Sequence, residues 1–242
     1  MLSPLLLAFS FLTRFPVDGR EEYDEDDYGN SYMFFPVVGL AVGALLALAA
    51  AGFSYIGTRE GTTAFLLLVI LVAATGGLHL DGVADTADGF FGGRDRNDAL
   101  RIMKESSTGT FGVAAVVLIL IGKFAALWSI LSIGAPSSII PALVLSRWAM
   151  SAASYKSAYP RDAGTGKSFT GRLTLQSYLI STAVAVGIAF LFAGKAALIP
   201  IAVAAVIALV VKTVSYRKIG GVTGDVLGTV NEITELVLLT LH

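Results

Sequence analysis

The sequence predicts an all-α integral membrane protein, a polytopic bundle of about six or seven transmembrane helices with an Asp-rich cytoplasmic loop. The first observation is composition, because 55% of the 242 residues are hydrophobic and only 14% are charged. Soluble domains are usually about 45–50% apolar and about 25% charged. The second observation is that the apolar residues form runs that approach the roughly 20 residues needed to cross a bilayer. We expect one membrane domain over residues 1–242.

The first element is the segment MLSPLLLAFSFLTRFP, residues 1–16. It lacks a basic start, and its polar end carries Arg14 and Pro16 in place of small residues typical of a signal-peptide cleavage site. We therefore predict a retained interfacial or half-buried helix.

The apolar runs that follow are 33–55, 62–78, 111–133, 137–153, 175–192, 196–211 and a weaker one at 226–241. Gly39 and Gly43 are spaced as a small-xxx-small pair, which favours close helix packing.

The basic residues predict the orientation in the membrane. The segments 14–32, 80–110, 154–174 and 212–225 hold most of the Lys and Arg residues. The connectors 56–61, 134–136 and 193–195 hold only Arg59 and Lys195. The positive-inside rule places the first set in the cytoplasm, and we expect a multi-pass protein of the cell membrane.

Composition also excludes some classes of protein. The net charge of −1 argues against nucleic-acid binding, which needs a basic face. The chain has no Cys, so disulfides and thiolate metal sites are impossible. A homo-oligomer is compatible with this composition.

The segment HLDGVADTADGFFGGRDRNDALRIMKES, residues 79–106, gathers carboxylates in an otherwise apolar chain. Asp81, Asp85 and Asp88 are spaced i, i+4, i+7, which aligns them along one face of a helix. Like charges in this register repel unless a cation lies between them, and oxygen ligands suit Mg²⁺ or Mn²⁺ better than Zn²⁺. Asp95 would complete this metal site, and His79 is a candidate base or ligand.

Simpler interpretations of the same segment stay open. It can be a solvated loop of mixed charge, in which basic neighbours neutralise the acids. His79 can be an ordinary residue of the membrane interface. Further on, Asn97 or Asp98 is expected to cap a short helix over 99–104.

An Asp cluster with Mg²⁺ is typical of membrane enzymes that transfer a phosphodiester from a nucleotide to an alcohol. The metal offsets phosphate charge and one carboxylate accepts the proton of the attacking hydroxyl. Basic residues would hold the nucleotide phosphates. We assign this role to Arg94, Lys104, Arg161 and Lys167, although positive-inside topology alone accounts for such charges. The Gly-Lys-Ser at 166–168 is not a P-loop, because the first Gly of that motif would fall on Arg161.

Polar residues also interrupt the last apolar run. They are Asp225, Asn231, Glu232 and Glu235. Ionisable groups in a membrane helix are costly and usually face an interior cavity. We expect this helix to line the active site and to add ligands or polar contacts, unless the segment lies at the surface. Arg147, inside another run, is expected either in a structural ion pair or in contact with phosphate.

Several segments resemble one family in order along the chain. They are LLLAFSFLTRFP, FFPVVGLAVG, HLDGVADTADGFFGGRDRNDALRIMKESSTGTFG, SRWAM, YPRDAGTGKSF and GGVTGDVLGTVNEITELVLL. Together they resemble the cobalamin (5′-phosphate) synthase family, the adenosylcobinamide-GDP ribazoletransferases. One departure is Ser106-Ser107-Thr108, where a basic or bulkier residue is expected.

The resemblance implies a Mg²⁺-dependent membrane transferase. It would join adenosylcobinamide-GDP to α-ribazole or its 5′-phosphate, release GMP, and form adenosylcobalamin or its 5′-phosphate. Two alternatives are a CDP-alcohol-phosphotransferase-like enzyme and a cation-coupled transporter. The first has the motif D-x-x-D-G-x-x-A-R, but Asp85 stands where its Arg should follow Ala84. The second conflicts with acids that cluster in one cytoplasmic segment.

Overall fold

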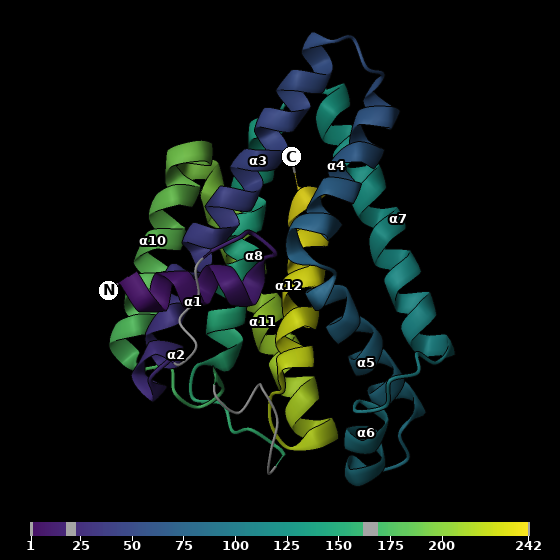
Figure 1. Ribbon diagram of the computed structural model, residues 1–242, viewed down its shortest axis with the longest axis vertical. Coiled ribbons are helices and arrows are strands. Elements are labelled where there is room, and N and C mark those ends of the chain that lie inside the picture. Colours follow the sequence, from purple (N-terminus) through teal and green to yellow (C-terminus); the bar gives the residue numbers. More distant parts are fainter. Residues whose placement is uncertain (1, 18–22, 162–168, 242) are drawn as a thin grey trace.

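The computed structural model describes residues 2–17, 23–161 and 169–241, and the predicted phosphate ligand Lys167 lies outside them. Within these ranges every regular element is a helix (Figure 1). The α-helices are α1 (Leu2–Leu12), α2 (Glu25–Ser31), α3 (Phe35–Tyr55), α4 (Glu60–Thr75), α5 (Leu78–Gly92), α6 (Arg96–Ile102), α7 (Thr110–Ser132), α8 (Ile139–Ser154), α10 (Leu175–Ala193), α11 (Leu198–Ile219) and α12 (Gly224–Leu239). Short 3-10 turns cover Tyr32–Phe34, Pro136–Ser138 and Gly194–Ala197. The all-α prediction is confirmed.

Each of the seven apolar runs lies on a helix, but the helices differ in length. Three helical segments of the described chain are long and apolar enough to cross a membrane: Glu25–Tyr55, Thr110–Ser132 and Leu175–Ile219. A fourth is obtained if α4 and α5 count as one bent span. Helices α4, α8 and α12 have 16 residues each. At about 1.5 Å per residue they are shorter than a hydrocarbon core of about 30 Å. The count of six or seven spans therefore stays a prediction.

The Asp-rich segment is helical where Asp81, Asp85 and Asp88 lie, as their i, i+4, i+7 spacing predicts. Residues 80–92, expected in a cytoplasmic loop, belong to helix α5. The chain turns by 86° between α4 and α5. Gly76 and Gly77 make this turn with φ values of 63° and 70°, a left-handed conformation that glycine adopts without a steric penalty. The Asp residues therefore lie on a helix whose direction is set by a two-glycine bend.

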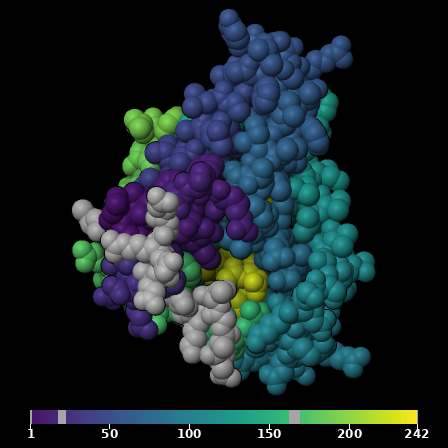
Figure 2. Space-filling view, in the orientation of Figure 1, coloured from purple at the N-terminus to yellow at the C-terminus, as the bar shows by residue number. Residues whose placement is uncertain are grey.

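Helix α8 forms the centre of the bundle, and all of its residues except Ala152 are buried. Helix α3 packs closely on it through the predicted small-residue pair. A Cβ on Gly43 would lie 2.9 Å from the Cα of Ile140, and one on Gly39 would lie 2.8 Å from the Cα of Val144. Helix α1 crosses the bundle at a steep angle to the long helices (Figure 1). In the space-filling view, the surface of α12 is visible in a recess beside this N-terminal segment (Figure 2).

Candidate active site at the contact of α5 and α12

Helices α5 and α12 touch at glycines, which bring their backbones unusually close. A Cβ on Gly82 would lie 2.7 Å from the carbonyl oxygen of Asp225, and a Cβ on Gly228 would lie 3.2 Å from the Cα of His79. The hydroxyl of Thr229 donates to the carbonyl oxygen of Gly82 at 3.1 Å. The start of α12 is therefore held beside the Asp stripe of α5.

Three carboxylates flank this contact, Asp81 and Asp85 on α5 and Asp225 at the start of α12. The charges of Asp81 and Asp225 both act on the carboxylate of Asp85, and Arg161 supplies the opposing charge. The Nη2 of Arg161 lies 3.2 Å from the Oδ2 of Asp225. Asp81 is exposed, while Asp85 and Asp225 are half-buried. One guanidinium against three carboxylates leaves an excess of negative charge, a condition that favours the approach of a cation.

The carboxylate oxygens of Asp81, Asp85 and Asp225 are the kind of ligand that a hard divalent cation prefers. Within the described residues, no three Asp, Glu or His side chains are already gathered closely enough to hold a metal ion. Asp81 and Asp85 lie on α5 and Asp225 lies on α12, and the glycine contact brings these two helices together. The metal site therefore stays a prediction, and Asp225 is the C-terminal carboxylate best placed for it.

Asp88 occupies a different position from the other two Asp residues of α5. Its Oδ2 accepts from the backbone N–H of Gly109 at 2.6 Å, and its Oδ1 accepts from that of Gly112 at 2.8 Å. These N–H groups belong to the start of α7, which has no intrahelical partners for them. Asp88 is 8% exposed. It caps α7, and both of its oxygens are already engaged.

Asp95 is also a capping residue. It precedes α6, and its Oδ1 accepts from the backbone N–H of Asp98 at 2.9 Å. The short helix therefore starts at Arg96, and the expectation that Asn97 or Asp98 caps a helix over 99–104 is wrong. Asp98 instead accepts from Arg101, which lowers the pKa of its carboxyl.

A basic cavity of about 580 Å³ lies next to the carboxylates, between α6 and the segment before residue 162. Lys104 and Arg161, two of the predicted phosphate ligands, line it, and Arg94 does not. Its other lining residues are Arg96, Asn97, Leu100, Arg101 and Pro160. The guanidinium of Arg96 donates to the carbonyls of Ile219 and Pro160, and Arg101 is paired with Asp98 and Glu105. Among the described lining residues, Lys104 is the cation whose side chain has neither an ion pair nor a hydrogen bond, and Arg161 links the cavity to the carboxylates through its pair with Asp225.

The remaining polar residues of α12 form a separate buried network. The Nζ of Lys123 lies 2.7 Å from the Oε2 of Glu232 and 2.5 Å from the Oε1 of Glu235. Arg147 pairs with the other oxygen of Glu235 and donates to the hydroxyl of Ser146. Two cations face two carboxylates, so the network is neutral. Arg147 is therefore in the ion pair that the sequence left as one of two options.

His79 and Asn231 border this network. The amide nitrogen of Asn231 lies 3.1 Å from the Nδ1 of His79, and His79 is only 2% exposed. Asp225 and Glu232, both on α12, contact different partners, Arg161 and Lys123. The sequence signal for the network was the presence of ionisable residues inside apolar runs, the cations Lys123 and Arg147 and the acids Glu232 and Glu235.

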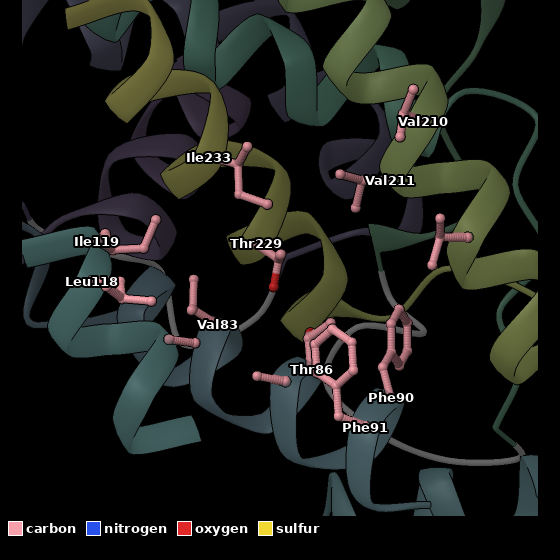
Figure 3. Close-up of a pocket in the computed structure, with 13 residues that line it drawn as sticks. Val83, Thr86, Phe90, Phe91, Leu118, Ile119, Val210, Val211, Thr229 and Ile233 are labelled. Carbon is pink, nitrogen blue, oxygen red and sulfur yellow. The ribbon is translucent and has the colours of Figure 1, made fainter. Parts of the chain in front are cut away.

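The opposite face of α5 borders an apolar cavity of about 350 Å³ (Figure 3). Val83 and Phe90 of α5 face Ile119 of α7, Val211 of α11 and Ile233 of α12 across it. This lining offers almost no polar group, so phosphate-bearing ligands belong on the Asp face of α5.

The chain is similar to known proteins over nearly its whole length. The family model described as cobalamin-5-phosphate synthase matches residues 4–242. Proteins named adenosylcobinamide-GDP ribazoletransferase are similar to the chain over nearly their whole length. The protein of Pelodictyon phaeoclathratiforme is 39% identical, with 98% of this chain and 94% of the relative covered. The proteins of Chlorobaculum tepidum and Fusobacterium nucleatum are 37% and 34% identical, covering 100% and 98% of this chain and 95% of each relative.

No solved structure matches the chain significantly. The match to the family model nevertheless runs through every helix from α2 to α12, including both helices that carry the carboxylates. The chain belongs to the cobalamin-5-phosphate synthase family.

Proposed function

We propose that this membrane transferase joins adenosylcobinamide-GDP to α-ribazole or its 5′-phosphate, with release of GMP, at the contact of α5 and α12. The reaction class follows from the family and from the names of the relatives. The observation that supports the location is the close contact of α5, which carries Asp81 and Asp85, with the start of α12, where Asp225 pairs with Arg161 of the basic cavity. The proposed site thus combines an acidic centre, formed by these carboxylates, with an adjacent basic cavity.

The chemistry requires both parts of this site. A ribazole hydroxyl attacks the phosphorus bonded to cobinamide, a new P–O bond forms, and the P–O bond to GMP breaks. The proton of the hydroxyl passes to a carboxylate of the acidic centre, which acts as general base. Lys104 and Arg161 hold the diphosphate of the donor, because cations bind phosphate oxygens through charge-assisted hydrogen bonds. Arg94 and Lys167 stay candidates for the same role.

We propose Mg²⁺ as the cofactor, with Asp81, Asp85 and Asp225 as the residues that would hold it. When bound, a divalent cation offsets the negative charge of the diphosphate. Asp88 and Asp95 contribute mainly through the helices that they cap. His79 is assigned a structural role, since it lies buried against Asn231.

The direct test is release of GMP. Purified protein in detergent, given adenosylcobinamide-GDP, α-ribazole and Mg²⁺, is expected to form GMP and the joined cobamide in equal amounts, measured by chromatography. Removal of Mg²⁺ by EDTA should stop the reaction, and added Mg²⁺ should restore it. If no divalent cation supports GMP release, the proposed reaction is wrong.

Substitutions test the location of the site. Asp85→Asn and Asp81→Asn should each lower kcat at least about 100-fold, the usual order for loss of a general base. Asp26→Asn, an exposed carboxylate on α2, is the matched control and should keep full activity. A double variant Asp81→Asn/Asp85→Asn with normal activity would move the site away from α5.

A further inference from the structure

A second cavity opens on Asp81 from the turn between α4 and α5. Its volume is about 550 Å³, and it shares no lining residue with the basic cavity. Its polar side chains are Arg14, Asp81 and Thr108. Its apolar wall is formed by Leu78, Leu80, Ala84, Val113, Val116 and Val117. Two charged side chains, Arg14 and Asp81, thus line a cavity whose remaining wall is suited to an apolar ring.

The position of Arg14 is built by the backbone around it. Its N–H donates to the carbonyl oxygen of Ala74 at 2.7 Å, which fixes the N-terminal segment to the end of α4. Its side chain runs over Gly76, where an added Cβ would lie 3.0 Å from the Cδ of Arg14. Gly76 therefore provides both the left-handed turn and the room for this side chain.

No described residue pairs with the charge of Arg14, whose side chain is exposed. Among the described residues its guanidinium has neither a hydrogen bond nor an ion pair, whereas Arg96, Arg147 and Arg161 all have partners. A guanidinium binds phosphate through two parallel hydrogen bonds. Thr108, across the cavity, adds a hydroxyl.

We infer that this cavity binds the acceptor nucleoside, and that Arg14 and Thr108 bind the 5′-phosphate of α-ribazole 5′-phosphate. The inference rests on the proposed function. It follows from chemistry, since the acceptor combines an aromatic base with a phosphate, and the cavity combines an apolar wall with a guanidinium with which no residue of the described ranges pairs. Asp81 lines the same cavity, so a bound acceptor places its ribose next to the acidic centre. Donor and acceptor then occupy separate cavities on either side of the carboxylates that both require.

Arg14 has two alternative roles that differ from binding the phosphate of the acceptor. A cation at the C-terminus of α4 stabilises the helix dipole, which is a purely structural role. The phosphate of a lipid headgroup would bind a guanidinium in the same way as the phosphate of the acceptor. Neither alternative depends on whether the acceptor is phosphorylated.

The test compares the two acceptors in wild type, Arg14→Ala and Thr108→Val. The kcat/KM for α-ribazole 5′-phosphate should fall by about 10- to 100-fold in Arg14→Ala, the effect of losing charge-assisted hydrogen bonds. The kcat/KM for α-ribazole should fall much less, so the ratio of kcat/KM for α-ribazole 5′-phosphate to that for α-ribazole should fall. Thr108→Val should change the ratio in the same direction by less, and Arg14→Lys should recover part of it. Arg59→Ala, a cation of the 56–61 connector, should leave the ratio as in wild type.

An equal loss with both acceptors would overturn the inference in favour of a structural role. Phosphatidylglycerol and phosphatidylcholine both carry a phosphate, so a loss that appears in nanodiscs of these lipids, and not in lipid-free detergent, would assign Arg14 to a lipid phosphate. Direct titration calorimetry of α-ribazole 5′-phosphate into wild type and Arg14→Ala tests binding without turnover. Weaker binding to the variant supports the inference even if GMP release fails, and equal binding overturns it.

Discussion

Asp85 and Asp88 are three residues apart on α5, yet their surroundings give them opposite roles. Asp88 accepts two backbone N–H groups at the start of α7. Asp85 is surrounded by the like charges of Asp81 and Asp225. A carboxylate that satisfies a helix terminus stabilises the fold, whereas one held among like charges destabilises it until a cation binds.

Stability measurements should separate these two residues. Asp88→Ala should lower the free energy of unfolding by about 1–2 kcal/mol, because it removes the cap of α7. Asp85→Asn should leave the thermal unfolding temperature in detergent unchanged or raise it, since it removes repulsion. If Asp85→Asn is the less stable of the two, the assignment of roles is reversed.

At the scale of elements, the contact of α5 with α12 decides whether the acidic centre exists. Gly82 lies against the backbone of Asp225, so any side chain there pushes the two helices apart. This backbone approach, and not the Asp stripe alone, brings the third carboxylate to the site.

Gly82→Ala should therefore lower activity strongly while the protein still folds. Overpacking of this kind usually costs about 1–3 kcal/mol. The control is Gly52→Ala on α3, where an added Cβ meets no atom within 4 Å. GMP release and thermal unfolding should be measured together, and full activity in Gly82→Ala would show that Asp225 is dispensable.

At the scale of the whole molecule, the neutral network of Lys123, Arg147, Glu232 and Glu235 joins α7, α8 and α12. Breaking one partner leaves an unpaired buried charge, which typically costs about 3–5 kcal/mol. The network therefore holds α7, α8 and α12, which are far apart in the sequence, in one packing arrangement.

Lys123→Met should lower the free energy of unfolding by about 3–5 kcal/mol, because Arg147 then faces two carboxylates. Adding Glu232→Gln restores neutrality, so the double variant should unfold at a higher temperature than Lys123→Met alone. Lys195→Met, which changes an exposed lysine, is the matched control. A double variant less stable than both single variants would contradict the charge-balance argument.

The orientation of the whole chain is also open to test. Reporter fusions within 93–110 and within 155–161 should both report the cytoplasm, and a fusion within 56–61 should report the opposite side. A cytoplasmic signal from all three positions would contradict the topology that the basic residues predict.

The sequence by itself determined the features that depend on local pattern. Hydropathy predicted the class and the positions of the apolar helices, the i, i+4, i+7 spacing predicted the Asp stripe, and ordered motifs predicted the family. These properties are local because they arise from hydrophobicity and helix periodicity along one segment.

The tertiary structure alone decided which charges meet. Asp225 joins Asp85, Asp88 caps α7, and Glu235 pairs with Lys123, although these last two are 112 residues apart. Spacing along one helix gives the direction of a side chain but not the helix that it faces. That partner is set by close packing at Gly82 and Gly228 and by the need to neutralise buried charge, and both depend on the whole bundle.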